Sequence, residues 1–350
     1  YVQLKSAYYN EKNIYTDSVR SVFGNNPCQT FINQFDFSKS INNFNILKIN
    51  LTNSLASSNG NNYLDIAEIN RTSITGSFKV NNPKYRLKHL LTTSLLFDKK
   101  YLSPFTFSYS LKREFHNHFN LYFNAGKVYR FPTINDLFWN PGGNLNLVPE
   151  EGYTSDIGII WNKKIHKVIF TFEPSLYSRW IDNWILWQPT GSFWSPMNVK
   201  KVWNRGLETS SKVHFINKKI TYDFTLKTAY NLSTNIEVYN SNNNSQDKQL
   251  IYTPHYKLVF KGLITYKEFT FTYLHNYTGY VFTSRDNENF LPSFNLGRLF
   301  LSFRVKLKNN SAKIFYKINN LYNTNYQVVM NRPMPLINHE IGINFKIKNK

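Results

Sequence analysis

The chain has 350 residues, 17% of them aromatic, and a formal net charge of +21 at pH 7. Its 42 Lys and Arg residues form no cluster with nucleic-acid-binding spacing, so we attribute the charge to a Lys- and Asn-rich composition and expect no nucleic-acid partner. The single cysteine, Cys28, excludes an intrachain disulfide, and no stretch approaches the ~18 apolar residues of a membrane helix.

Segments with alternating apolar and polar residues recur along the whole chain and predict β-strands with one apolar face. We count about sixteen of them, many with ten or more residues. A tilted strand needs ~9–11 residues to cross a bilayer, whereas strands of soluble proteins are nearer ~5–6. In chain order, the clearest segments are 105–115, 118–130, 221–230, 255–266, 269–277, 299–308 and 341–348.

The connections between these segments alternate in length. Every even-to-odd connection is a short turn, as at 116–117 and 267–268, whereas most odd-to-even connections are long. Short turns on one rim and long loops on the other are typical of outer-membrane barrels. The sequence therefore predicts an all-β fold, a transmembrane antiparallel β-barrel with apolar faces in lipid and long loops outside the cell. The predicted long loops are 10–27, 54–65, 131–151, 180–199, 231–249, 281–295 and 320–338, and the short segment 99–103 is the exception.

Segment 128–153 carries the strongest local motif. YRFPT at 129–133 is followed by DL at 136–137, GN at 143–144 and LVPE at 147–150. By chemistry alone this is a strand end, a Pro-initiated turn, a short Asp-containing helical turn and a Gly-Gly break. The motif resembles a segment of TonB-dependent outer-membrane receptors, with Leu145 where that family usually has Pro.

The C-terminal segment agrees with this resemblance. NLYN at 320–323 and the pair Met334-Pro335 look like the closing hairpin of the family. Two departures stand out. Leu336-Ile337 stands where the family usually has Arg, and the last residue is Lys350 rather than an aromatic. The second departure puts the assembly signal in doubt.

The resemblance implies an N-terminal plug and a barrel of about 22 strands. Residues 1–350 would then be the C-terminal barrel portion, with the plug and first strands missing. The family implies a Gram-negative outer-membrane location, uptake of a scarce nutrient and coupling to an inner-membrane TonB complex through the missing part. We expect no enzyme activity and no cofactor, since the sequence has no Walker loop, nucleophile elbow or paired carboxylates.

Segment 179–210 is rich in tryptophan and resembles the vitamin B12 (cobalamin) receptors of this family. Indole rings bring a large apolar area and one donor each to a ligand. Rings at strand ends, such as Trp180 and Trp203, fit an aromatic belt at the lipid headgroups better. For Trp187 and Trp194, ligand contact and loop packing both stay open. The candidate ligand-binding residues are Phe138, Trp139, Trp184, Trp187, Trp194 and Asn198.

Three other interpretations stay open. A siderophore receptor shares the general motifs. A self-closing, sixteen-stranded passive porin would pair residues 1–9 with 341–348, and a soluble β-rich adhesin or lectin would cover its apolar faces with protein. In segment 284–290, Asp286 and Glu288 carry the oxygen ligands that calcium prefers, but we interpret the segment as a solvated loop and predict no metal.

Overall fold

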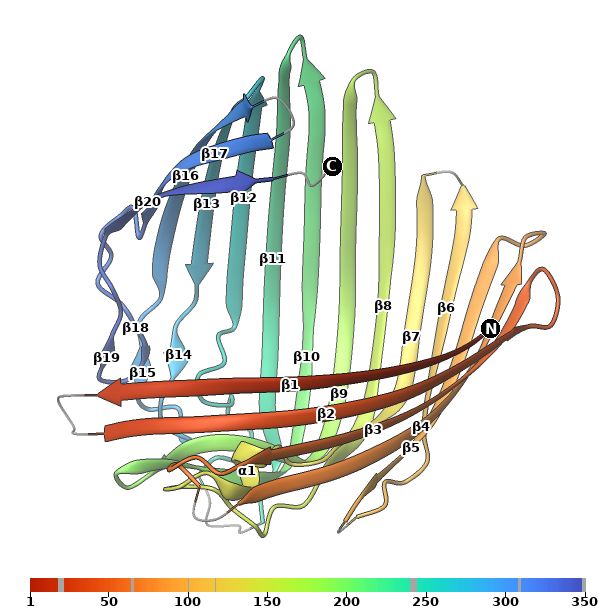
Figure 1. Cartoon of the computed structure of the whole chain (residues 1–350), viewed down its shortest axis with the longest axis vertical. Helices are drawn as coiled ribbons and strands as arrows, with labels where there is room; N and C mark the ends of the chain where they lie inside the picture. Colours follow the sequence, from red (N-terminus) through yellow and green to blue (C-terminus); the bar gives the residue numbers. More distant parts are fainter. Residues whose placement is uncertain are drawn as a thin grey trace.

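One antiparallel sheet of 16 strands forms nearly the whole molecule in the computed structural model (Figure 1). The structure describes residues 1–17, 22–63, 66–99, 101–116, 118–239, 244–307 and 310–347. The parts of the predicted segments at 18–21, 64–65, 100, 117, 240–243, 308–309 and 348–350 lie outside these residues. The strands of the sheet are β1 Val2–Asp17, β2 Val22–Ser40, β3 Asn45–Ser58, β4 Ala67–Asn82, β5 Leu87–Asp98, β6 Thr106–His116, β7 Phe119–Arg130, β8 Glu150–Ile165, β9 Val168–Thr190, β10 Phe193–Asn217, β11 Ile220–Glu237, β12 Tyr256–Tyr266, β13 Phe269–Thr278, β16 Phe294–Leu307, β17 Asn310–Asn319 and β20 Asn338–Lys346.

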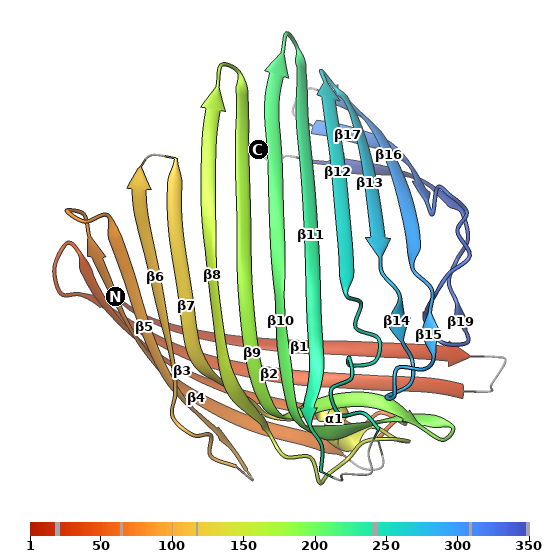
Figure 2. The ribbon, with the colours of Figure 1, turned by 180° about the vertical axis from the view of Figure 1, so that it is seen from behind.

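The strands of the sheet follow one another in chain order, with β13 next to β16 and β17 next to β20. Two short hairpins stand outside it, β14 Val281–Phe282 with β15 Phe290–Leu291, and β18 Gln327–Val329 with β19 Arg332–Pro333. Strands β6 to β13 make one curved wall, and β1 to β5 cross on its other side (Figures 1 and 2). The predicted count of about sixteen strands is confirmed.

The outer face of the sheet is apolar and bare. Ile157, Leu176 and Leu207 pair across β8, β9 and β10 and are 45%, 57% and 41% exposed. No layer of described residues covers them, so the soluble adhesin interpretation is wrong. An apolar face of this size needs a hydrocarbon environment. Outer-membrane barrels have the same arrangement, because their strands turn apolar side chains outward to lipid and polar side chains inward.

The inner face carries polar side chains that bond along and across strands. Asp36 on β2 accepts hydrogen bonds from Gln34 at 2.8 Å, from Asn50 at 2.7 Å and from Lys5 at 3.3 Å. On the same inner face, near the other edge of the sheet, Lys317 of β17 forms an ion pair with Glu340 of β20 at 2.5 Å. The inner face therefore suits a water-filled or protein-filled lumen, as the alternation predicts.

Aromatic rings mark two levels of the outer face. On β8 these levels are Tyr153 and Trp161, eight residues apart, or ~26 Å along a strand at ~3.3 Å per residue. That spacing is close to the ~25 Å apolar band of outer-membrane barrels. At the level of Tyr153, nearer the long connections, Trp180 and Trp203 stack at 4.5 Å and both donate to Ser178 Oγ. Their position agrees with the aromatic belt.

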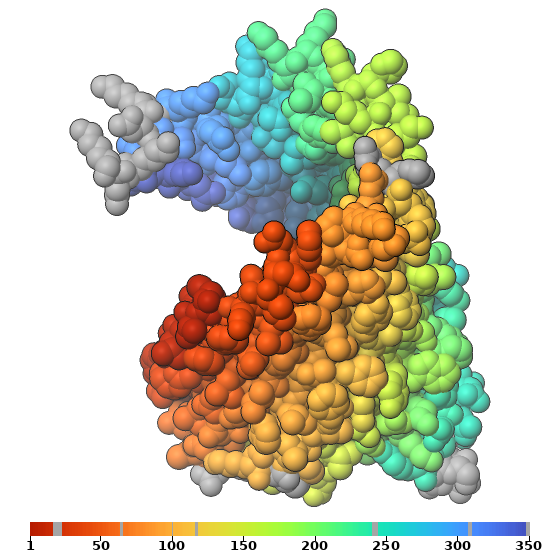
Figure 3. All heavy atoms as spheres, turned by 90° about the vertical axis from the view of Figure 1, so that its right-hand side faces the viewer, coloured from red at the N-terminus to blue at the C-terminus, as the bar shows by residue number. Residues whose placement is uncertain are grey.

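The sheet does not close into a ring. β1 pairs only with β2, and β20 pairs only with β17. A space-filling view shows a wide gap between the first strands, in red, and the last strands, in blue (Figure 3). The pairing of residues 1–9 with 341–347 that a self-closing porin requires is absent from the described residues, so this expectation is wrong.

Two predicted long loops are instead strand extensions. Residues 2–17 of β1 pair with residues 22–37 of β2, which covers the described part of segment 10–27. β9 and β10 pair as far as Thr190 and Phe193 across segment 180–199. β9 and β10 have 23 and 25 residues, about twice what a bilayer needs. Backbone pairing therefore continues into water, where no apolar face is required and sequence alternation weakens.

The predicted helical turn is present as α1, Ile134–Phe138. Thr133 caps its N-terminus in a capping box, because Thr133 Oγ1 accepts from Asp136 N at 3.2 Å and the Asp136 carboxylate accepts from Thr133 N at 2.8 Å. No helix of the described residues is long and apolar enough to cross a membrane.

Candidate functional site

The best-packed part of the molecule lies at the rim where the long connections meet, here called the loop rim. Two segments pack on each other there: residues 131–149, and residues 183–198 at the end of the β9–β10 hairpin (Figure 1). We call these two segments together the loop platform. The wall between the rims buries few apolar side chains, because its outer face is open. The apolar side chains buried at the loop rim include Phe131, Leu147, Ile181, Ile185, Val202, Leu250 and Ile251.

Asp136 is the centre of the loop platform. It is 5% exposed, although an unpaired buried carboxylate is costly. Besides Thr133 N, its carboxylate accepts a hydrogen bond from Trp187 Nε1 at 2.7 Å, and Arg130 Nη1 lies 3.5 Å away. The motif therefore fastens α1 to the hairpin.

Arg130 and Glu150 close the base of the same segment. Arg130 Nε and Nη2 donate to the two carboxylate oxygens of Glu150 at 2.6 and 2.7 Å, a bidentate pair. Glu150 Oε1 also accepts from the backbone N–H of Ile185 at 2.7 Å. One carboxylate thus joins the ends of the 131–149 segment to β9.

The Gly-Gly break allows the two parts of the platform to touch. Gly142 has φ of +127°, and a Cβ there would lie 2.1 Å from the carbonyl oxygen of Trp194. Ser195 Oγ donates to Gly142 O at 2.7 Å, and Asn144 Nδ2 donates to Pro196 O at 3.1 Å. Only glycine fits a backbone approach this close.

The other flank of the platform rests on the β3–β4 connection. Tyr63 and Trp139 meet edge to face, with ring centroids 5.8 Å apart, and the Tyr63 hydroxyl donates to Asn135 Oδ1 at 2.5 Å. Arg71 donates to Pro132 O and lies 5.0 Å over the ring of Phe131. The platform is therefore held from both sides.

The candidate residues from sequence are not gathered around one cavity. Trp187 is bonded to Asp136, Trp139 packs on Tyr63, and Trp194 lies 5.3 Å from the ring of Tyr252. Trp187 and Trp194 lie on β9 and β10 rather than in a loop. Phe138 and Trp184 are half-buried, and neither stacks on another described aromatic ring. A ligand role for the six residues stays a prediction.

Asn198 joins the hairpin to the segment before β8. Its Oδ1 accepts from Val148 N at 3.0 Å, and its Nδ2 donates to Val148 O at 3.0 Å and to Asn183 O at 2.6 Å. Three hydrogen bonds from one amide indicate a structural tie in the unliganded molecule.

Substituting this amide tests the tie. In an Asn198→Ala variant we expect cleavage by a protease added outside to rise in segment 144–149, because three hydrogen bonds worth ~1 kcal/mol each are lost. Limited proteolysis of the detergent-solubilised protein measures the rate. Asn331→Ala, in the exposed β18–β19 turn, is the control and should leave segment 144–149 uncut. Equal cleavage in both variants would rule out the tie.

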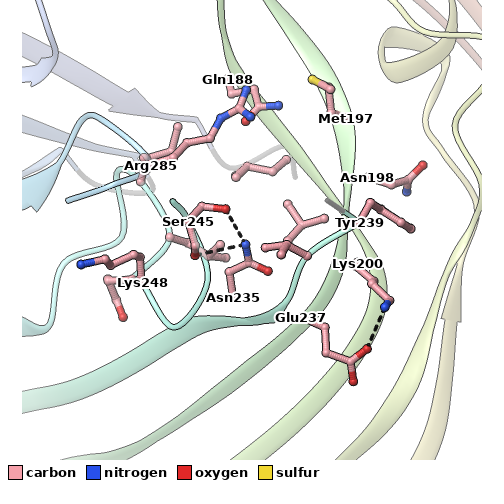
Figure 4. Close-up of a pocket in the computed structure, with 16 residues that line it drawn as sticks. Gln188, Met197, Asn198, Lys200, Asn235, Glu237, Tyr239, Ser245, Lys248 and Arg285 are labelled. Atoms are coloured by element: carbon pink, nitrogen blue, oxygen red, sulfur yellow. Dashed lines mark hydrogen bonds and ion pairs between the residues drawn. The ribbon is translucent and has the colours of Figure 1, made fainter. Parts of the chain in front are cut away.

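A cavity of about 200 Å³ lies beside the platform, between the β9–β10 hairpin and residues 245–251 (Figure 4). Of the six candidates from sequence, Asn198 is the one that lines it. No local pattern marks the other lining residues, among them Gln188, Asn235 and Arg285, because they come from separate connections whose meeting depends on the sheet.

Segment 284–290 is stabilised by its own hydrogen bonds. The Asp286 carboxylate accepts from Ser284 Oγ at 2.5 Å and from Glu288 N at 3.0 Å, and these bonds hold the pKa of Asp286 below its usual range. Within the described residues, no three His, Cys, Asp or Glu side chains gather as metal ligands would.

Solved structures share this fold. The copper transporter OprC superimposes with a TM-score of 0.74 at 15% identity, over 99% of this chain and 62% of that chain. The ferric enterobactin receptor PfeA of Pseudomonas aeruginosa gives 0.68 at 12% identity, over 98% and 58%. Identities this low establish the fold alone, and the chain spans about three fifths of each of these proteins.

Sequence comparison adds two curated relatives, both vitamin B12 transporters named BtuB. The protein of Vibrio vulnificus is 33% identical over 87 residues, 24% of this chain and 14% of the relative. That of Photobacterium profundum is 31% identical over 108 residues, 29% and 17%. The family model described as "TonB dependent receptor-like, beta-barrel" matches residues 3–321. The chain therefore belongs to the β-barrel family of TonB-dependent receptors, which are non-enzymatic transporters of the outer membrane.

Proposed function

We propose that this chain supplies the wall and ligand-capturing loops of a receptor that imports cobalamin across the outer membrane. The similarity to two vitamin B12 transporters carries the choice of ligand. The loop platform supports a capture role, since its segments are held together before any ligand arrives. Energy for import comes from the TonB complex of the inner membrane.

The open sheet supports a second part of the proposal, that residues 1–350 are the C-terminal portion of a larger barrel with a plug. Sixteen alternating strands leave β1 and β20 antiparallel to each other. An even number of further strands must therefore lie between them to close an antiparallel ring. Lipid cannot satisfy the backbone groups of an open edge, so closure is required in the membrane.

Binding of cyanocobalamin tests the ligand. We expect isothermal titration of the detergent-solubilised receptor to give saturable binding of cyanocobalamin and none of ferric enterobactin. The reverse result would assign a siderophore, the second candidate, which the shared general motifs leave open.

A measurement of cobalamin uptake tests the second part of the proposal, that residues 1–350 are one portion of a larger barrel with a plug. Cells that express residues 1–350 alone should show no saturable, energy-dependent cobalamin uptake, because the plug that TonB pulls is absent. Radiolabelled uptake with and without a protonophore measures this. Energy-dependent uptake by this chain alone would refute the proposal.

A further inference from the structure

The cavity at the loop rim has walls that are fixed by hydrogen bonds. Asn235 Nδ2 donates to Ser245 O and Oγ (Figure 4). Gln249 Oε1 accepts from Ser233 N at 2.8 Å. Asn287 then bonds to both backbone groups of Gln249, at 2.9 and 3.0 Å. Residues 245–251 thus lie against β11 in one position, and the cavity is formed in advance.

Two buried polar residues of this cavity, Asn235 and Gln188, have side-chain atoms without a hydrogen-bond partner among the described residues; on Asn235 the atom is Oδ1. Gln188 is the second. It is 3% exposed, yet its side-chain amide makes no hydrogen bond to any residue in the part of the chain that the structure describes. Nε2 and Oε1 of Gln188 are not among the fully enclosed unpartnered atoms, so a molecule in the cavity can reach them. Gln188 therefore offers the two N–H groups of Nε2 as donors and Oε1 as an acceptor to a ligand that enters the cavity.

The charges of the cavity favour an acceptor in the ligand. Arg285 lines it and makes no ion pair with a described residue, whereas Lys200 is paired with Glu237 at 3.3 Å. Lys248 interacts with Asp286. Arg285 is exposed, however, so water already solvates its charge and an exposed pair adds little.

The buried group decides between the possible ligands. A carboxylate would satisfy Nε2 of Gln188 and Arg285 but would leave Oε1 facing an anion. A primary amide satisfies both atoms, because its carbonyl accepts from Nε2 while its NH₂ donates to Oε1. Its carbonyl keeps a second lone pair for Arg285.

The size and lining of the cavity limit the rest of the ligand. About 200 Å³ is less than the ~300–1,000 Å³ of sites that enclose a whole ligand, so only an arm can enter. The apolar side chains of Leu186, Met197 and Leu250 suit an aliphatic stem.

We infer that this cavity binds a primary amide carried on a short aliphatic arm of the imported ligand. The inference rests on the proposed function, since cobalamin carries primary amides on such arms. Gln188 would then be a specificity-determining residue.

A matched pair of variants tests the inference. Gln188→Leu removes both hydrogen-bonding groups at similar volume, and Gln29→Leu makes the same change on the exposed outer face of β2. We expect Gln188→Leu to weaken cyanocobalamin binding roughly tenfold in titration calorimetry, and Gln29→Leu to leave it unchanged. Far-UV circular dichroism and heat-modifiable gel mobility confirm folding.

Small probes test the amide without relying on cobalamin or on a variant. In saturation-transfer NMR, the wild-type protein should bind hexanamide in preference to hexanoate. A preference for hexanoate would overturn the amide assignment. Unchanged cyanocobalamin binding in folded Gln188→Leu would overturn the subsite and leave the proposed function standing. Hexanamide binding without cyanocobalamin binding would support the subsite and overturn cobalamin as the ligand.

Discussion

Replacing Asp136 by Ala is expected to destabilise the loop platform by about 3 kcal/mol. The substitution leaves Trp187 Nε1 and Thr133 N without an acceptor at a part-buried position, and Arg130 loses a nearby charge. Hydrogen exchange followed by mass spectrometry should show the protected amides of α1 and the hairpin exchanging about 100-fold faster. Exchange in the wall, for example in β12, should not change.

Two further variants make this prediction specific. Trp187→Phe removes the indole N–H together with part of the ring. Because the hydrogen bond to Asp136 is lost in either single variant, the double variant should lose less than the sum of the two single losses. Asp182→Ala, in the same hairpin, breaks only an ion pair of 3.6 Å with Lys201 and should cost at most ~1 kcal/mol. Additive losses at Asp136 and Trp187 would mean that their hydrogen bond contributes nothing.

Replacing Leu176 by Arg is expected to destabilise the wall by ~2–4 kcal/mol when the protein is in lipid. Leu176 points outward from β9, midway between the ring of Phe172 and that of Trp180, and is 57% exposed. An arginine there must leave water for the middle of the hydrocarbon layer. Urea unfolding of the completed receptor in lipid vesicles, followed by tryptophan fluorescence, measures the loss.

The adjacent residue provides the control. Ser175 points to the opposite face of β9 and pairs with Glu208 of β10, so an arginine at position 175 enters the lumen beside a carboxylate. Its cost should be near zero. Equal losses for Leu176→Arg and Ser175→Arg would mean that the outer face does not meet lipid.

The wall could be predicted from the sequence because its cause is local. Each strand alternates between lipid and lumen, so residues such as those of 299–307 reveal their faces by period alone. The short helical turn at α1 could be predicted as well, because the capping box that the structure shows there lies within four residues, Thr133 to Asp136. The continuation of β9 and β10 through 180–199 was missed because water imposes no alternation there, and pairing with the partner strand decides the structure.

The candidate site was harder to predict for the same reason. The tryptophans of 184–194 were recognised by residue type, but the acceptor of Trp187 lies 51 residues earlier, at Asp136. Gln188 has no local signal at all, because its burial depends on residues 245–251. Contacts between separate connections follow from the curvature of the sheet, which no short stretch of sequence specifies.

The connectivity of the sheet has a consequence for biogenesis. Each strand of the wall lies beside its chain neighbour, so the wall can assemble hairpin by hairpin at small entropic cost. Three contacts of the loop platform span 51 to 72 residues of sequence: Asp136 to Trp187, Asn144 to Pro196 and Tyr63 to Asn135. Their cost in chain entropy becomes small only after the hairpins of the wall have paired. Membrane insertion of the wall should therefore precede folding of the loop platform. A substitution that disrupts the loop platform should yield receptors that are inserted in the membrane but do not bind their ligand.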